Sequence, residues 1–282
     1  MIESQSVTDA LRIAAERRQT CGFFFDFDGT LSEIRDDPAG VEPVPGVVAA
    51  VAEIAEHIRT VAVVSGRPVD FLRKHFGGLP VRLYGLYGME SLDPDGTLWT
   101  DPEVVPWISA VADVAKRAVT ELDPDILVED KRLSVALHYR TAPHLRAQVE
   151  RWGGDRASEY GLSPLPGRMV LELKPPIRRD KGGVIRAATG DLRCVWYFGD
   201  DLGDLPALTA LADRAKADRG FEVFRVGVSN PETGDQVAAM MDVIVGSPRD
   251  LVPLLRQAGQ AFTPRTRDRT PAAAGLSRPP PG

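Results

Sequence analysis

The chain has 282 residues, of which 43% are hydrophobic and 26% are charged. This length and composition predict a globular protein with a sizeable core, organised as one large domain or two modest ones. The 34 basic and 40 acidic residues give a net charge of −6, which argues against nucleic-acid binding through bulk positive charge. Residues 1–18 lack the apolar region of a signal peptide, and no stretch approaches the roughly 18 apolar residues of a membrane span. We therefore expect a cytoplasmic monomer with neither a nucleic-acid nor a membrane partner.

Apolar strand patterns alternate with helical patterns in the first part of the chain. In chain order they predict a helix over 7–18, a strand at 23–25, a helix over 47–58, a strand at 61–64, a helix from Val69 and a strand over 81–86. Strands that are apolar on both faces and alternate with helices indicate a parallel α/β sheet.

The pattern changes near residue 90. The following segments predict a turn at 93–96, a helix over 102–122, strands at 126–130 and 134–140, a helix over 143–160 and a strand at 168–174. Polar and apolar residues alternate in these strands, which is typical of a sheet with one exposed face. We therefore expect an inserted α+β domain over about 90–177, and Pro175 and Pro176 mark its exit.

The α/β pattern then returns. It predicts a helix from about residue 180, strands at 194–198, 222–228 and 242–245, and a helix that Ser247 caps. The expected division is a parallel-sheet core over 1–89 and 178–262 with the insertion between its two parts. Residues 263–282 are rich in Pro, Ala and Arg with little hydrophobic pattern, so we expect a disordered tail. Cys21 and Cys194 lie in apolar runs and are expected to be buried thiols.

Three of the predicted strands end in polar residues rich in oxygen. Asp26 and Asp28 follow three phenylalanines, and leaving a charge buried without a partner costs about 3–5 kcal/mol, so both should lie where the strand leaves the core. The other two strand ends carry Ser65 and the pair Asp200 and Asp201. Ligands of open parallel sheets bind outside the carboxyl ends of the strands, so these residues predict one shared site.

The carboxylates of this site suit magnesium, which takes one or two carboxylates together with water and phosphate oxygens. Asp26 and Asp200 are the first candidates for its ligands, and a backbone carbonyl near Asp28 completes the set. Asp201 and Asp204 would hold metal-bound water or orient Lys181.

The same residues suit phosphoryl transfer. Asp26 would attack phosphorus, while Asp28 would protonate the leaving alcohol and then activate water. Ser65 and the backbone N–H of Gly66 would hold phosphate oxygens, and Lys181 would offset the negative charge of nucleophile and phosphate.

Each of these residues also has a simpler structural explanation. Ser65 alone could cap a helix, Lys181 could be a solvated residue of a first helical turn, and Asp204 could cap a helix before Pro206. The pair of aspartates after the phenylalanine run has no such explanation. Other chemistries lack their patterns, because the chain has no P-loop, no zinc-like histidine spacing and no nucleophile elbow.

Four segments resemble the signatures of haloacid-dehalogenase-like phosphohydrolases: 26–31, 64–67, Lys181, and 199–201 with Asp204. A further resemblance, to the trehalose-6-phosphate phosphatases, rests on 28–34, 65–67, 128–131, 137–140 and 180–182. It implies a Rossmann-like core with an inserted α+β cap domain, and Mg²⁺-dependent hydrolysis of a sugar phosphate, trehalose 6-phosphate, through an aspartyl-phosphate.

The resemblance also implies which residues contact the substrate. They are Phe27, Ser65, Gly66 and Arg67 in the core, and Glu129, Lys131, Arg140, Arg168 and Glu172 in the cap. Strand alternation supports part of this, because residues 168, 170, 172 and 174 share one face while 169, 171 and 173 share the other.

Several positions depart from the family pattern. Tyr87 stands where the family usually has histidine, Lys174 where it has arginine, and Gly203 and Leu205 where it has threonine and glutamate. Two alternatives stay open, and these departures motivate the first. One is a phosphatase for another phosphosugar, such as a glycosyl-phosphoglycerate or sucrose 6-phosphate, and the other is a sugar-phosphate sensor without turnover.

Overall fold

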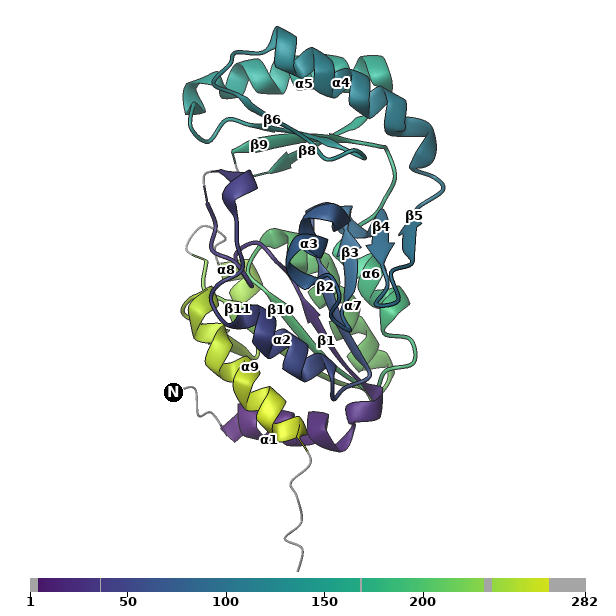
Figure 1. The fold of residues 1–282 in the computed structure, drawn as a ribbon, viewed down its shortest axis with the longest axis vertical. Coiled ribbons are helices and arrows are strands. Elements are labelled where there is room, and N and C mark those ends of the chain that lie inside the picture. The colour runs from purple at the N-terminus through teal and green to yellow at the C-terminus, as the bar shows by residue number, and fades with distance from the viewer. Residues whose placement is uncertain (1–4, 36, 168, 231–234, 264–282) are drawn as a thin grey trace, which may run out of the picture.

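A computed structural model describes residues 5–35, 37–167, 169–230 and 235–263. Two sheets organise these residues, one above the other in Figure 1. The larger sheet has the strand order β12-β11-β10-β1-β2-β3-β4-β5. Its strands are β1 (Cys21–Phe25), β2 (Thr60–Val64), β3 (Arg82–Gly85), β4 (Glu90–Leu92), β5 (Leu98–Thr100), β10 (Cys194–Gly199), β11 (Glu222–Val228) and β12 (Val243–Val245). The six strands from β12 to β3 run parallel, and β4 and β5 form an antiparallel edge.

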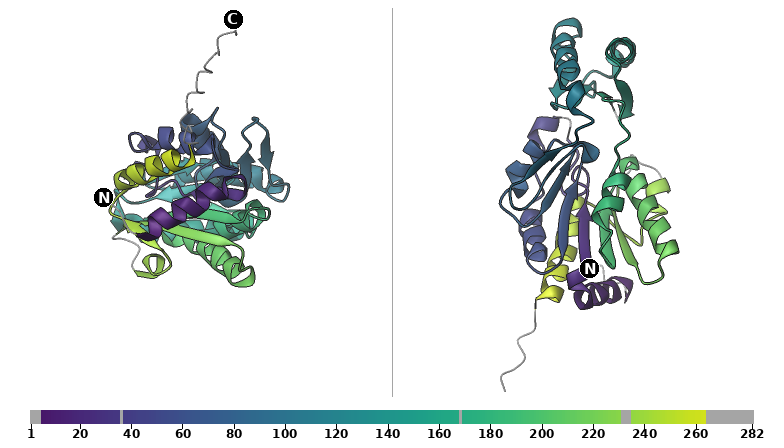
Figure 2. Two further views of the ribbon diagram at one scale, coloured as in Figure 1. Left: turned by 90° about the horizontal axis from the view of Figure 1, so that it is seen from below. Right: turned by 90° about the vertical axis from the view of Figure 1, so that its right-hand side faces the viewer.

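Helices cover both faces of the larger sheet, as the right-hand view of Figure 2 shows. One layer contains α1 (Gln5–Glu16), α2 (Val47–Ala55), α3 (Val69–Phe76) and α9 (Pro248–Phe262); the other contains α6 (Lys181–Ala188), α7 (Leu205–Ala217) and the short α8 (Asp235–Ala238). Successive side chains of a strand point to opposite faces. Phe23 and Phe25 therefore pack in the first layer, whereas Phe24 packs in the second.

The smaller sheet is antiparallel, with the strand order β6-β7-β9-β8. Its strands are β6 (Leu127–Asp130), β7 (Val135–His138), β8 (Ser163–Gly167) and β9 (Val170–Lys174). The helices α4 (Ile108–Glu121) and α5 (Arg146–Tyr160) cover one face, against which Leu137, Leu171 and Leu173 pack. The other face looks toward the carboxyl-terminal edge of the larger sheet (Figure 1).

These observations confirm the predicted α/β fold, with a mostly parallel central sheet and an additional α+β sheet. The predicted burial of Cys21 and Cys194 as free thiols is also confirmed. Ser247 caps α9 through a hydrogen bond from the backbone N–H of Asp250, as expected. No helix among the residues that the structure describes has the length and apolar character needed to cross a membrane.

Several predicted element boundaries were wrong. The helix expected over 47–58 ends at Ala55, and the one expected from residue 102 begins at Ile108, after a 3₁₀ turn at Val105–Trp107. In the second case Pro106 lacks the N–H that an α-helix interior needs, so the regular helix starts beyond it.

Three strands escaped the sequence analysis. The turn at Gly96 joins β4 and β5, which extend the larger sheet although they lie within the predicted insertion. β8 contains Pro164 and Pro166, a composition that argues against a strand unless the strand lies at an edge, as β8 does. The division of the chain into domains remains a prediction. Arg168 and the tail from residue 264 lie outside the described residues.

Candidate active site

The polar strand ends meet at one edge of the larger sheet. β1 lies between β10 and β2 and is parallel to both, so the residues after these strands converge. The backbone N–H of Asp26 donates a hydrogen bond of 2.8 Å to the carbonyl oxygen of Phe198, which fixes the first aspartate beside the end of β10. Ser65 follows β2 and is buried. The three strand ends therefore lie side by side at one edge of the sheet.

Lys181 joins the two sides of this edge. It is the first residue of α6, whose start is fixed by Asp180, because that side chain accepts a 2.7 Å hydrogen bond from the N–H of Gly183. The ammonium of Lys181 lies 2.6 Å from Asp26 Oδ1 and 2.7 Å from Asp204 Oδ1. Lys181, Asp26 and Asp204 are 3%, 4% and 0% exposed. One buried cation is thus shared between two buried carboxylates.

Burial and neighbouring charges shift the pKa values of this group in defined directions. Burial raises the pKa of Asp26 above its usual range, although Lys181 opposes the shift. Burial also disfavours the charged form of Lys181, but Asp204 and Asp26 outweigh this effect and raise its pKa. The lysine therefore stays protonated and can neutralise negative charge next to the nucleophile candidate.

Asp204 has hydrogen-bond partners at both of its oxygens. Its Oδ1 accepts hydrogen bonds from Lys181 and, at 2.7 Å, from the hydroxyl of Tyr197. Its Oδ2 accepts from the backbone N–H groups of Asp200 and Asp201, at 2.9 and 3.2 Å. This geometry suits a residue that orients Lys181, one of the two roles that the sequence left open for it. The sequence analysis missed Tyr197; the signal was a hydroxyl in a buried strand, where it needs a partner.

The carboxylates of Asp201 and Asp204 lie close to that of Asp26. Oxygens of Asp26, Asp201 and Asp204 lie within 4.8 Å of one another, a spacing that could hold a metal ion. Oδ2 of Asp26 accepts no hydrogen bond from the described residues, so it is open to a metal or to phosphorus. Hard carboxylate oxygens are the ligands that Mg²⁺ prefers, so this donor set fits the ion.

Asp200, expected beside Asp26 as a metal ligand, is held by other groups. Its carboxylate accepts hydrogen bonds of 3.2 Å from Thr30 Oγ1 and 2.7 Å from Asn230 Nδ2. Burial and the charge of Asp204 raise the pKa of Asp200 to about 7. Gly29, with φ +80°, leaves room for it: a Cβ there would lie 2.1 Å from an Asp200 oxygen.

Asp28 forms a bidentate ion pair with Arg67. Nε and Nη2 of the guanidinium lie 2.9 and 2.6 Å from the two carboxylate oxygens. Arg67 also donates to the carbonyl oxygen of Pro38 at 2.7 Å, and its guanidinium lies 4.6 Å from the centre of the Phe71 ring. The backbone N–H of Arg67 donates to Ser65 Oγ at 3.1 Å. Asp28 is thus held in place by a fixed cation at the edge of the cavity that Asp26 also lines.

The face of the smaller sheet opposite this edge is polar. His138 and Glu129 share a 2.9 Å hydrogen bond, and a second Glu129 oxygen lies 3.9 Å from Arg67. Lys131 Nζ lies 3.6 Å from Glu172 and 3.5 Å from the carbonyl oxygen of Gly66. These contacts place two predicted substrate residues of the smaller sheet against the strand end of β2.

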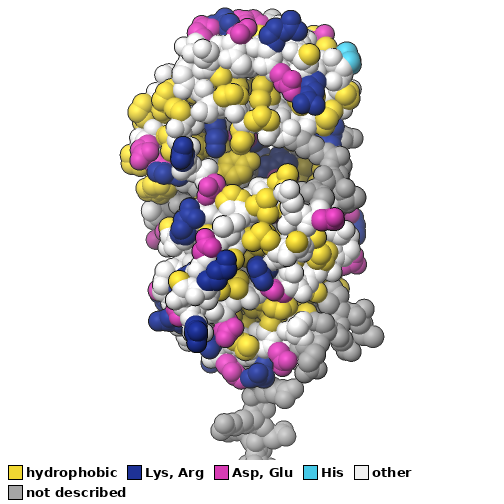
Figure 3. Space-filling view, turned by 180° about the vertical axis from the view of Figure 1, so that it is seen from behind, with side chains coloured by type: hydrophobic (Ala, Val, Ile, Leu, Met, Phe, Trp, Pro, Cys, Tyr) yellow, Lys and Arg dark blue, Asp and Glu magenta, His cyan; other side chains and the backbone are white. Residues whose placement is uncertain are grey.

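Two adjoining cavities lie between the sheets. Figure 3 shows the surface hollowed between the upper part of the molecule, which contains the smaller sheet, and the lower part, which contains the larger sheet. The smaller, of about 240 Å³, reaches Asp26, Ser65 and Lys181. The larger, of about 730 Å³, extends along the smaller sheet to Glu172. The predicted site residues that line one or both are Asp26, Asp28, Ser65, Gly66, Arg67, Glu129, Lys131, Arg140, Glu172, Lys181, Asp200 and Asp201.

Phe27 is placed differently. Its side chain is fully buried and packs against the rings of Phe71, His75 and Phe76, so any contact with a ligand would come from its backbone.

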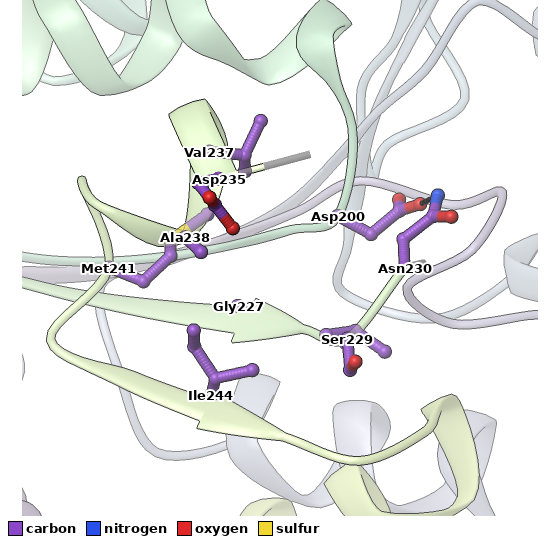
Figure 4. Close-up of a pocket in the computed structure, with 10 residues that line it drawn as sticks. Asp200, Gly227, Ser229, Asn230, Asp235, Val237, Ala238, Met241 and Ile244 are labelled. Carbon is purple, nitrogen blue, oxygen red and sulfur yellow. Dashed lines mark hydrogen bonds between the residues drawn. The ribbon is translucent and has the colours of Figure 1, made fainter. Parts of the chain in front are cut away.

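A third cavity, of about 250 Å³, lies on the far side of Asp200, between the ends of β11 and β12 and helix α8 (Figure 4). In this view the side chains of Asp200 and Asn230 meet, and both residues line the third cavity as well as the larger one.

Comparison with known proteins places this site in a family. The sequence model of the family described as trehalose-phosphatase matches residues 24–239, which include every carboxylate and the lysine described above. The chain belongs to the trehalose-phosphatase family. The resemblance inferred from the sequence motifs is therefore confirmed.

The relatives differ in length and in similarity. The chain is 35% identical to a trehalose-phosphate phosphatase of Mycolicibacterium paratuberculosis over 229 residues, covering 77% of this chain and 57% of the relative. It thus spans little more than half the length of such relatives.

Among solved structures, the C-terminal domain of C. albicans trehalose-6-phosphate phosphatase matches with a TM-score of 0.71 at 22% identity, covering 89% of this chain and 96% of that one. A trehalose-6-phosphate phosphatase related protein matches with a TM-score of 0.68 at 21% identity, covering 85% and 97%. Both share the fold.

Proposed function

We propose that this protein is a magnesium-dependent phosphoric monoester hydrolase that converts trehalose 6-phosphate to trehalose and phosphate. The observation that carries the proposal is the buried group of Asp26, Lys181 and Asp204, of which Asp26 and Lys181 line a cavity with a polar opposite wall. Family membership supports the substrate class, and the trehalose-phosphate phosphatases among the relatives support trehalose as the sugar.

Asp26 is the proposed nucleophile. Its Oδ2 attacks phosphorus as the bond from phosphorus to the sugar oxygen breaks, which leaves an aspartyl-phosphate. Lys181, held at 2.6 Å from Oδ1, offsets the negative charge that gathers there. Asp204 and Tyr197 keep the ammonium in place through the contacts described above.

Asp28 is the proposed acid and base. It gives a proton to the departing sugar oxygen and then takes one from the water that releases phosphate and restores Asp26. Both oxygens of Asp28 are paired with Arg67, so proton donation requires this ion pair to loosen. The phosphate of the substrate can compete with Asp28 for the guanidinium of Arg67, and this competition would loosen the ion pair.

Asp26 and Asp201 are the proposed protein ligands of Mg²⁺. The ion would neutralise charge on the phosphate oxygens during transfer. Ser65 Oγ and the N–H of Gly66 are the proposed phosphate donors, in line with their place at the end of β2.

The smaller sheet is proposed to recognise the sugar. Glu129, Lys131, Arg140 and Glu172 line the cavities on this side. Lys131 and Glu172 form an ion pair, and Glu129 shares a hydrogen bond with His138. Groups of both signs match sugar hydroxyls, which both donate and accept. We also propose that residues from about 101 to 177 form a cap domain on a core built from the rest, because β4 and β5 pair with the larger sheet.

Phosphate release from trehalose 6-phosphate, glucose 6-phosphate, sucrose 6-phosphate and a glycosyl-phosphoglycerate, each with and without Mg²⁺, tests this proposal. We expect Mg²⁺-dependent release from trehalose 6-phosphate well above the others. Preferential release from another sugar would overturn the proposed recognition but keep the core chemistry. Binding without release from any of them would favour a sugar-phosphate sensor.

A further inference from the structure

Tyr87 lies where the two cavities meet. It lines the smaller cavity together with Asp26 and Lys181, and it lines the larger one together with Glu172 and Lys174. A phosphate monoester bound between the sheets has its phosphate in the first cavity and its sugar in the second. The Tyr87 side chain therefore stands beside the bond that joins them.

The backbone holds Tyr87 in an uncommon conformation. Leu86 and Tyr87 have φ values of 50° and 60°, in the left-handed region that residues with a Cβ rarely adopt. Two 3.0 Å hydrogen bonds hold this segment, from the N–H of Leu86 to the carbonyl oxygen of Arg67 and from the N–H of Tyr87 to that of Ser65. Strained backbone of this kind concentrates at functional sites. Here it attaches Tyr87 to the loop that is proposed to bind phosphate.

The position of the Tyr87 hydroxyl is closely defined. A Cβ on Gly66 would lie 2.7 Å from this oxygen, so only glycine at position 66 leaves room for it. The ammonium of Lys174 lies 5.6 Å from the centre of the ring and fixes it from the side of the smaller sheet. Contacts on two sides, with Gly66 and with Lys174, therefore fix the position of the hydroxyl.

This hydroxyl has no hydrogen-bond partner among the described residues, and its half-buried side chain lines the cavities between the sheets. Tyrosine hydroxyls in such places usually have one. Burial, with the negative charge of Glu172, raises the pKa of Tyr87 above its usual range, so the group keeps its proton and can donate. An oriented donor that faces a cavity without a partner points to a ligand atom.

We propose that the Tyr87 hydroxyl is a specificity-determining group that forms a hydrogen bond with the sugar ring bearing the phosphate. The inference rests on the proposed function, because it assigns a part of the same substrate. Tyr87 is not a member of the group that carries out phosphoryl transfer. Its contact is present before the reaction begins, so its loss weakens substrate binding rather than chemistry.

The test compares Tyr87→Phe, which removes only the hydroxyl, with wild type and with Tyr84→Phe. Tyr84 lies on β3, three residues earlier, lines neither cavity, and its hydroxyl accepts a hydrogen bond from Arg82. For Tyr87→Phe we expect KM for the preferred sugar phosphate to rise about 3- to 10-fold with kcat nearly unchanged. The inhibition constant of inorganic phosphate, which has no sugar, should stay the same. Tyr84→Phe should leave all three quantities unchanged.

The outcomes separate this inference from the proposed function. Wild type without activity on trehalose 6-phosphate contradicts the proposed function, and the comparison is then made on whichever sugar phosphate it does hydrolyse. Wild-type activity with an unchanged KM in Tyr87→Phe overturns only the role of Tyr87. An equal rise in KM and in the phosphate inhibition constant also overturns it, because the hydroxyl would then act on phosphate. Absence of activity on every sugar phosphate overturns both.

Discussion

The two walls of the cavity are built in different ways. On the side of the larger sheet, Asp26, Lys181 and Asp204 are almost completely buried, and the contacts of the lysine are 2.6 and 2.7 Å long. On the side of the smaller sheet, the ion pairs of Lys131 with Glu172 and of Arg67 with Glu129 are 3.6 and 3.9 Å long, while Glu129 and Glu172 also have shorter hydrogen bonds with His138 and Ser134. A fixed group suits chemistry, which needs accurate placement, whereas looser pairs can exchange partners with a bound sugar. Changes on the two walls should therefore have different effects.

The largest effect is expected from Asp26→Asn. An amide of the same shape cannot attack phosphorus, so activity should fall at least about 1,000-fold, as for other nucleophiles. The fold should persist, because Lys181 keeps its contact with Asp204. Phosphate release measures the activity of the variant, and thermal melting measures the stability of its fold. Activity within 10-fold of wild type would show that another residue is the nucleophile.

Asp204→Asn should lower both stability and activity. It removes the negative charge that faces the buried ammonium of Lys181, and leaving a buried charge unpaired typically costs about 3–5 kcal/mol of unfolding free energy. Asp201→Asn is the matched control, because Asp201 is exposed. It should change stability by less than about 1 kcal/mol but raise the Mg²⁺ concentration needed for half-maximal activity. Denaturant unfolding and magnesium titrations separate the two. Equal stability losses would contradict the assigned roles.

Glu172→Gln tests the opposite wall. The amide retains an oxygen to accept the hydrogen bond from Ser134, but it loses the charge that faces Lys131. We expect kcat/KM for the sugar phosphate to fall about 10-fold, with inhibition by inorganic phosphate unchanged. Glu222→Gln, at the start of β11, should have no effect. If kcat/KM for the sugar phosphate and the affinity for inorganic phosphate fell equally, Glu172 would not act on the sugar alone, and the two walls would not have separate roles.

The smallest effect concerns pH. Burial opposes the charge of Glu129, but its hydrogen bond with His138 and the charges of Lys131 and Arg67 lower its pKa below the ordinary 4.5. The unfolded chain therefore binds a proton at a higher pH than the folded one, and the stabilisation is present above about pH 4.5 and is lost as pH falls through the folded pKa.

Glu129→Gln should accordingly cost up to about 1 kcal/mol of unfolding free energy near pH 7 and less at pH 3.5. Glu56→Gln, at an exposed position after α2, is the control. Urea unfolding at both pH values gives the difference. A cost that does not depend on pH would mean that Glu129 contributes through packing instead of charge.

The same contrast explains what the sequence could predict. Asp26, Ser65 and Asp200 each follow an apolar strand directly, so local pattern and the rule for parallel sheets placed them together. Residues 170–174 showed their polar face through alternation alone. These signals are short in sequence and rest on the periodicity of strands.

Other features depend on contacts between distant segments. The pairing of Asp28 with Arg67 joins residues 39 positions apart, and that of Asp200 with Asn230 joins residues 30 apart. Neither partner carries a pattern that names the other. The strand β8 is defined by its pairing with β9, since its two prolines conceal it in the sequence. Such features follow from packing, which a local pattern does not contain.

The most direct test of the account is to identify the phosphorylated residue. Wild-type protein is quenched with acid during turnover of its sugar phosphate, reduced with borohydride, which converts an aspartyl-phosphate to homoserine, and analysed by peptide mass spectrometry. We predict homoserine at position 26, with none in Asp26→Asn. Modification of Asp28 or Asp200, or turnover without modification at position 26, would contradict the central claim that the buried edge of the larger sheet carries out the chemistry through Asp26.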